Sequence, residues 1–147
     1  MSQISILVEF AKADTTGIHQ EISLGNMPNF QAQSINSLTG VDTRGAKKVL
    51  SAHAIRHILK NHEDNNEQST RSQIGIVDSD FDLLNKILTN PDNVIRGKDS
   101  NRGEPALKFI KELHSKTYTI VMSLRVKKND KNILEKSLVV NTMYIKK

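Results

Sequence analysis

Cysteine is absent from the 147 residues of this chain. That absence excludes disulfide scaffolds, thiol nucleophiles and thiolate metal sites. Aromatic residues make up only 4% of the chain, too few for a single-strand binder built on stacking platforms. No apolar run approaches the roughly 18–20 residues of a membrane span, and the N-terminus lacks the pattern of a secretory signal. We therefore expect a cytoplasmic protein without a membrane partner.

The remaining composition is that of a globular domain. Hydrophobic residues make up 37% of the chain and charged residues 25%, and the length suits one domain. The formal net charge of +5 is compatible with a polyanionic partner such as nucleic acid. A charge of this size is common, so by itself it does not identify the partner.

The N-terminal third predicts a hairpin and a helix. Apolar residues alternate with other residues at Ile4, Ile6, Val8 and Phe10, which is the period of a strand. Turn residues follow at 14–17, and alternation resumes over residues 18–24, so we expect an N-terminal hairpin. A helix is expected to begin at Pro28 and to end at Gly40.

Two further helices are predicted in the middle of the chain. Residues 47–62 form the best helical pattern, with Ile55, Ile58 and Leu59 on one side of the wheel. The other side carries a basic group: His53, Arg56, His57 and Lys60. Residues 62–71 are too polar to bury and predict a loop. A second helix is expected from Asp78 or Ser79 to a stop at residues 90–92.

From Val94 onward the hydrophobic period is two, which indicates strands. The clearest strand spans residues 118–127, and the last spans 138–145. We therefore predict an α+β fold, with an N-terminal hairpin and helices packed on one face of a C-terminal antiparallel sheet. The other sheet face is expected to be polar and to form the floor of a groove. Its side chains come from the clearest strand: Thr119, Ser123, Arg125 and Lys127.

Three of the five histidines fall within residues 53–62. Imidazole moves protons near neutral pH, so the cluster suggests general acid–base chemistry. His53 and His57 are also spaced to share a metal ion on one helix face, but no third ligand is evident. Ala54 occupies the place of the metalloprotease glutamate. The plainer alternative is a solvated basic helix face. His57 and His62 converge only if the helix ends near residue 61, since five residues rotate the helix by about 140°.

Other polar side chains are weaker candidates. Thr142 and Tyr144 lie two apart on one face of the last strand and can contact a phosphate or a base. Lys108 is expected to face the same groove as Arg125, where either cation can offset charge on a phosphorane. Glu67 and Arg71 lie in the polar loop.

Set in order, these residues resemble a phage-type member of the barnase–EndoU–colicin–RelE-like nuclease superfamily. The resemblance begins near residues 37–42 and continues through the helix that carries His57 and His62. It then includes the segments 67–74, 80–81 and 87–92 and closes on residues 142–144. Glu63 stands where many relatives have a glycine.

The resemblance implies a metal-independent endoribonuclease that needs no cofactor. In this reaction the ribose 2′-hydroxyl attacks the adjacent phosphate, leaving a 2′,3′-cyclic phosphate. The resemblance also implies that His57 and His62 are the acid–base pair, in either order, and that Lys108 or Arg125 stabilises the phosphorane. Thr142 and Tyr144 would position phosphate or base. Further substrate contacts are expected from four residues: Glu67, Arg71, Ser123 and Lys127.

The domain prediction is a single nuclease-like domain, with residues 1–36 as an extension and 37–147 as the core. RNA is the expected partner, tRNA being one candidate. A phage-associated or toxin-like role would add an immunity or antitoxin protein, and would place the activity in the cytoplasm of a target or host bacterium. The alternative is a catalytically inactive module of the same fold that binds RNA or protein.

Overall fold

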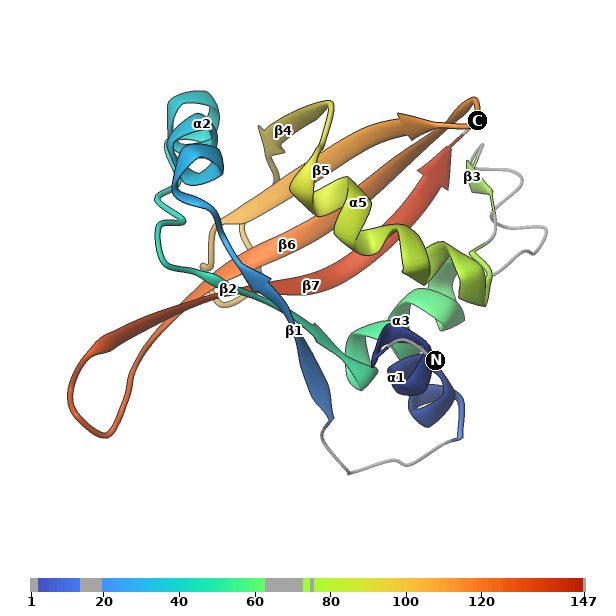
Figure 1. Cartoon of the computed structure of the whole chain (residues 1–147), viewed down its shortest axis with the longest axis horizontal. Coiled ribbons are helices and arrows are strands. Elements are labelled where there is room, and N and C mark those ends of the chain that lie inside the picture. The colour runs from blue at the N-terminus through green and yellow to red at the C-terminus, as the bar shows by residue number, and fades with distance from the viewer. Residues whose placement is uncertain (1–2, 14–19, 63–72, 75, 147) are drawn as a thin grey trace.

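The computed structural model describes residues 3–13, 20–62, 73–74 and 76–146, with the backbone alone at residues 61, 62, 73 and 74. One β-sheet runs through this part of the chain, and helices pack against one of its faces (Figure 1). The α+β class predicted from the sequence is confirmed.

The helical segments are α1 (Gln3–Lys12), α2 (Asn29–Thr39), α3 (Ala52–His62), the 3-10 helix η1 (Asp78–Leu83) and α5 (Leu84–Thr89). The strands are β1 (Glu21–Asn26), β2 (Lys47–Ser51), β3 (Gln73–Ile74), β4 (Asn93–Arg96), β5 (Ala106–Leu113), β6 (Lys116–Lys128) and β7 (Leu134–Lys146). They form a seven-stranded sheet in the order β1-β2-β7-β6-β5-β4, with β3 paired to the C-terminal end of β7.

Several predicted elements are confirmed. Helix α2 begins after Pro28 and ends at Gly40, whose φ of 77° is the left-handed conformation that glycine adopts without a Cβ clash. The helix expected from residues 78–79 is present as η1 and α5. The C-terminal strands β4 to β7 pair antiparallel, as the period of two predicts.

The predicted N-terminal hairpin is wrong, because residues 3–12 form helix α1. Its buried residues are Ile4, Leu7, Val8 and Ala11, which is helical spacing, whereas Ile6 is 57% exposed. This segment is so apolar that it satisfies both periods, and packing of α1 against α3 favoured the helix. Strand β1 is real, but it pairs with β2.

The predicted helix over residues 47–62 is correct only from Ala52, because residues 47–51 form β2. Four successive β2 residues, from Lys48 to Ser51, are buried, and only Lys47 at the start of the strand is exposed. Burial lowers the pKa of the Lys48 ammonium. β2 runs parallel to β7, so the sheet is mixed and not purely antiparallel.

The two sheet faces differ in chemistry. The helix-covered face carries the core, including Leu107, Phe109, Ile120 and Leu138. A bulge at Asn141 reverses the alternation of β7, so that Thr142 shares the opposite face with residues 137 and 139. We call this opposite face the open face. None of the helices within the described ranges is long and apolar enough to cross a membrane.

A pair of substitutions tests the helical form of α1. Leu7 is 4% exposed, so Leu7→Ala should lower the free energy of unfolding by about 2 kcal/mol or more. Ile6→Ala, its exposed neighbour, should change it by about 0.5 kcal/mol or less. Urea denaturation measures both. A hairpin would bury Ile6 together with Ile4 and Val8, so a larger loss from Ile6→Ala would contradict the helix.

Candidate active site

The site is organised by the junction between β2 and α3. Ser51 is the last residue of β2, and α3 begins at the next residue. The Ser51 Oγ accepts a hydrogen bond from the backbone N–H of Ala54 at 3.1 Å, as an N-cap does. Ser51 also pairs with Glu21 of β1. The direction of α3 is therefore fixed by its covalent and hydrogen-bonded connection to the sheet.

This junction divides the side chains of α3 between core and solvent. Ile55 and Ile58 are fully buried, whereas His53 and His57 are exposed. The two histidines are four residues apart, so they lie one above the other on the same side of α3. They line a hollow of about 410 Å³, which we call the histidine groove, lined by Glu21, Ser51, His53, Ala54, His57, Arg125, Val139, Val140 and Asn141.

Arg125 is the cation that β6 brings to the histidine groove. Its Nε donates to Glu104 Oε2 at 3.0 Å, so the loop before β5 holds the guanidinium in place. Arginine has five N–H donors, and this bond uses one of them. The remaining donors can bind an anion in the groove. Nearby, the Asn141 side-chain amide donates to Ser123 Oγ.

Lys108, Thr142 and Tyr144 lie further along the open face. Lys108, Val121 and Thr142 form one cross-strand row, and Tyr144 lies opposite Thr119 in the next. The row of Lys108 is four residues from Arg125 along β6, about 13 Å at the rise of a strand. Lys108 and Arg125 therefore share a face, as the alternation predicts, but only Arg125 lines the histidine groove.

The hydroxyl of Thr142 is buried and finds no hydrogen-bond partner within the described part of the chain. The Tyr144 ring lies 5.7 Å from the Lys146 ammonium. Both residues are half-buried on the open face, and the Thr142 hydroxyl itself is covered there. Their roles toward phosphate or base stay a prediction.

The predicted pair of His57 and His62 stays a prediction. Helix α3 is described up to His62, one residue beyond the end near residue 61 that the sequence predicts. The His62 side chain lies outside the described residues, as do Glu67 and Arg71. His53 is the histidine that shares the groove with His57.

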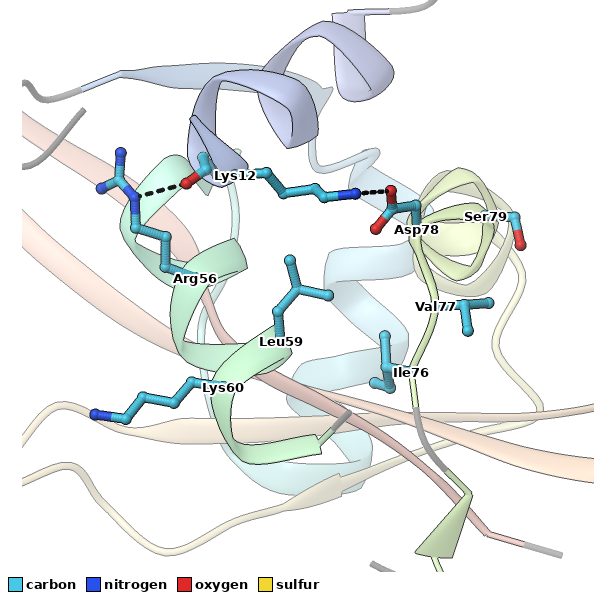
Figure 2. Close-up of a pocket in the computed structure, with 9 residues that line it drawn as sticks. Lys12, Arg56, Leu59, Lys60, Ile76, Val77, Asp78 and Ser79 are labelled. Atoms are coloured by element: carbon cyan, nitrogen blue, oxygen red, sulfur yellow. Dashed lines mark hydrogen bonds and ion pairs between the residues drawn. The ribbon is translucent and has the colours of Figure 1, made fainter. Parts of the chain in front are cut away.

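The basic side chains of α3 line two different hollows. Arg56 and Lys60 line a second, larger cavity of about 1020 Å³ between α1, α3 and η1 (Figure 2). There the Arg56 Nε donates to the Ala11 carbonyl at 3.0 Å, and Lys12 pairs with Asp78 at 2.6 Å. Arg56 thus ties α1 to α3, whereas His53 and His57 face the other hollow.

Among the described residues, no group of three or more His, Asp or Glu side chains is placed to hold a metal ion. His53 and His57 alone provide two imidazoles at helical spacing. Glu21, the carboxylate in the same groove, pairs through β1 with Ser51.

Four members of this site are not among the site residues predicted from the sequence. His53 lies in the predicted histidine cluster but outside the predicted acid–base pair, and its spacing of four residues from His57 is the signal that could have joined them. Ser51 precedes the helix at a capping position. The predicted helix over residues 47–62 placed Ser51 inside the helix, which hid this signal. Glu21 and Glu104 reach the site through long-range pairing, and no local pattern marks them.

Comparison with known proteins places this architecture in a class of nucleases. A family model described as phage-Barnase-EndoU-ColicinE5/D-RelE like nuclease3 matches residues 26–147. The chain belongs to this nuclease family, as the resemblance in the sequence implied. No curated protein and no solved structure matches the chain significantly.

The cap at Ser51 can be tested directly. Ser51→Ala should lower the free energy of unfolding by about 1 kcal/mol, because the N–H of Ala54 loses its partner. Ser51→Thr keeps a capping hydroxyl and should recover most of the loss. Ser34→Ala, at an exposed position inside α2, is the control and should cost nothing. Equal stability of Ser51→Ala and wild type in thermal and urea unfolding would show that the cap does not hold α3.

Proposed function

We propose that this protein is a metal-independent endoribonuclease that cleaves RNA in the histidine groove. The observation that carries the proposal is the meeting of His53, His57 and Arg125 in one groove of a chain from a nuclease family. Two imidazoles and one guanidinium are the groups that phosphodiester cleavage by an internal hydroxyl needs.

In the proposed reaction one imidazole removes the proton of the ribose 2′-hydroxyl. The 2′-oxygen then attacks the adjacent phosphorus, and the bond from phosphorus to the 5′-oxygen breaks. The second imidazole, protonated, gives its proton to the leaving 5′-oxygen. The products are a 2′,3′-cyclic phosphate and a free 5′-hydroxyl, and the step consumes neither water nor a cofactor.

Arg125 is proposed to neutralise the charge that develops on the nonbridging oxygens. Its guanidinium is positioned in advance by Glu104, and such fixed donors stabilise charge without reorganising during the reaction. Lys108, Thr142 and Tyr144 are proposed to contact the substrate on one side of Arg125 along the open face, and Lys127 on the other side. Ser123 is 1% exposed, so its proposed part is to hold the side-chain amide of Asn141 in the groove. His53 is proposed as the second imidazole because it lines the groove together with His57, and His57 is common to this pair and to the pair expected from the sequence.

RNA is the proposed partner, with tRNA as one candidate. A toxin-like role with an immunity protein stays a prediction that goes beyond the phage-associated family description. A protein that binds RNA without cutting it would instead be the inactive module of the same fold.

The first test uses a DNA oligonucleotide with a single internal ribonucleotide, and an all-DNA control. Cleavage should occur only at the ribonucleotide, should persist in EDTA and should yield a 2′,3′-cyclic phosphate, detected by mass spectrometry. His57→Ala should lower kcat/KM by about 10²–10⁴-fold, since it removes a proton-transfer group. His114→Asn, an exposed histidine of the β5–β6 turn, is the control.

The second histidine is identified by comparing His53→Ala with His62→Ala. If His53→Ala lowers kcat/KM as much as His57→Ala does, the result supports the pair in the groove. If only His57→Ala and His62→Ala lower kcat/KM, the pair expected from the sequence is restored. Cleavage abolished by EDTA would indicate a metal held by the histidines, and salt-sensitive binding without cleavage would indicate the inactive module.

A separate comparison locates the phosphorane stabiliser. Arg125→Gln should lower kcat by about 10²–10³-fold, since it removes donors aimed at developing charge. Lys108→Gln should lower kcat by less than about tenfold, because the row of Lys108 is some 13 Å from that of Arg125. Single-turnover cleavage rates measure both, and Glu104→Gln controls for loss of the ion pair alone. The reverse order of losses would move the reaction centre to the row of Lys108 and Thr142.

A further inference from the structure

The histidine groove continues into a narrower hollow along β7. This second hollow, of about 130 Å³, shares Glu21, Arg125 and Val139 with the groove. A third hollow, of about 410 Å³, continues from it and shares Lys47, Glu135 and Ser137. Hollows that share lining residues are adjacent, and together these three make a depression that leads from His53 and His57 toward the base of the β6–β7 hairpin.

The register of three strands explains its shape. Ser137 of β7 lies opposite Arg125 of β6 on one side and Lys47 of β2 on the other. The small side chain in the middle forms the floor, and the long cationic side chains form the walls. Lys127 extends the β6 wall by one further step on the same face. We call this depression the β7 trough.

The cations of the trough differ in how far they are already neutralised. Arg44 binds Asp42 through two contacts of 3.1 Å, and Lys136 lies 3.4 Å from the same carboxylate. The Arg44 guanidinium holds the pKa of Asp42 well below its usual range, so this carboxylate stays charged. Arg125 is paired with Glu104. Within the described residues, Lys47 and Lys127 take part in no ion pair and remain to bind an anion.

We propose that the β7 trough binds the sugar–phosphate chain of single-stranded RNA next to the cleaved bond, with Lys47 and Lys127 as phosphate contacts. This inference rests on the proposed function and assigns a path to its substrate. Its walls stand on β2 and β6, two strand spacings or about 10 Å apart, which suits one sugar–phosphate chain better than a duplex. Glu21 and Glu135 lie among the lysines, where carboxylates repel phosphate but accept hydrogen bonds from base amino groups. That mixture fits a nucleic acid better than a polyphosphate or an anionic membrane.

The test measures binding apart from cleavage. The probe is a fluorescent single-stranded RNA of about 12 nucleotides, 2′-O-methylated at every ribose so that the 2′-oxygen cannot attack. Anisotropy titrations over about 50 to 200 mM KCl give the slope of log affinity against log salt concentration. The double variant Lys47→Gln/Lys127→Gln should reduce this slope by about 1.4, since each phosphate contact on a single strand contributes about 0.7.

The control is Lys86→Gln/Lys116→Gln, which removes the same charge from exposed positions on α5 and at the start of β6. It should leave the slope as in wild type. An equal slope change in both double variants would show that only net charge matters and would overturn the trough. Failure of wild type to bind the probe would overturn it as well. Because the probe cannot be cut, a protein without nuclease activity can still pass this test, so the two proposals fail separately.

Discussion

The hydrogen bond from Ala54 to Ser51 is the contact on which the geometry of the site depends. With no loop between β2 and α3, the rotation of the helix about its axis is set where the strand ends. Capping at that point sends Ile55 and Ile58 into the core and leaves His53 and His57 on the side of the open face. A change of one residue in this junction would rotate the helix by about 100° and move the histidines out of the groove.

The second constraint is the bulge at Asn141. Ser137 and Val139 precede it on the open face, and the extra residue allows Thr142 to rejoin that face while Met143 stays in the core. One strand thereby supplies the floor of the trough, one edge of the histidine groove and Thr142 in the row of Lys108. Irregular pairing within a regular sheet is what places these groups in one continuous surface.

The local sequence pattern predicted the structure correctly where a single hydrophobic period, of helix or strand, dominated a segment. The alternation of β6 predicted that Arg125 and Lys127 share a face, and Gly40 predicted the end of α2. It failed where composition was ambiguous. Residues 3–12 fit both periods. Strand β2, buried from Lys48 to Ser51, had neither the alternation of a half-exposed strand nor a turn before α3.

The sequence by itself determined the α+β class, the nuclease family and the set of available chemical groups, since without cysteine these are histidine, hydroxyl and cation. Tertiary structure decided which of those groups meet. Glu104 reaches Arg125 across 21 residues, and Lys47 faces Arg125 across β7 only because β2 adds to the sheet in parallel. Such pairings depend on the free energy of burying whole elements together, which no local window of sequence contains.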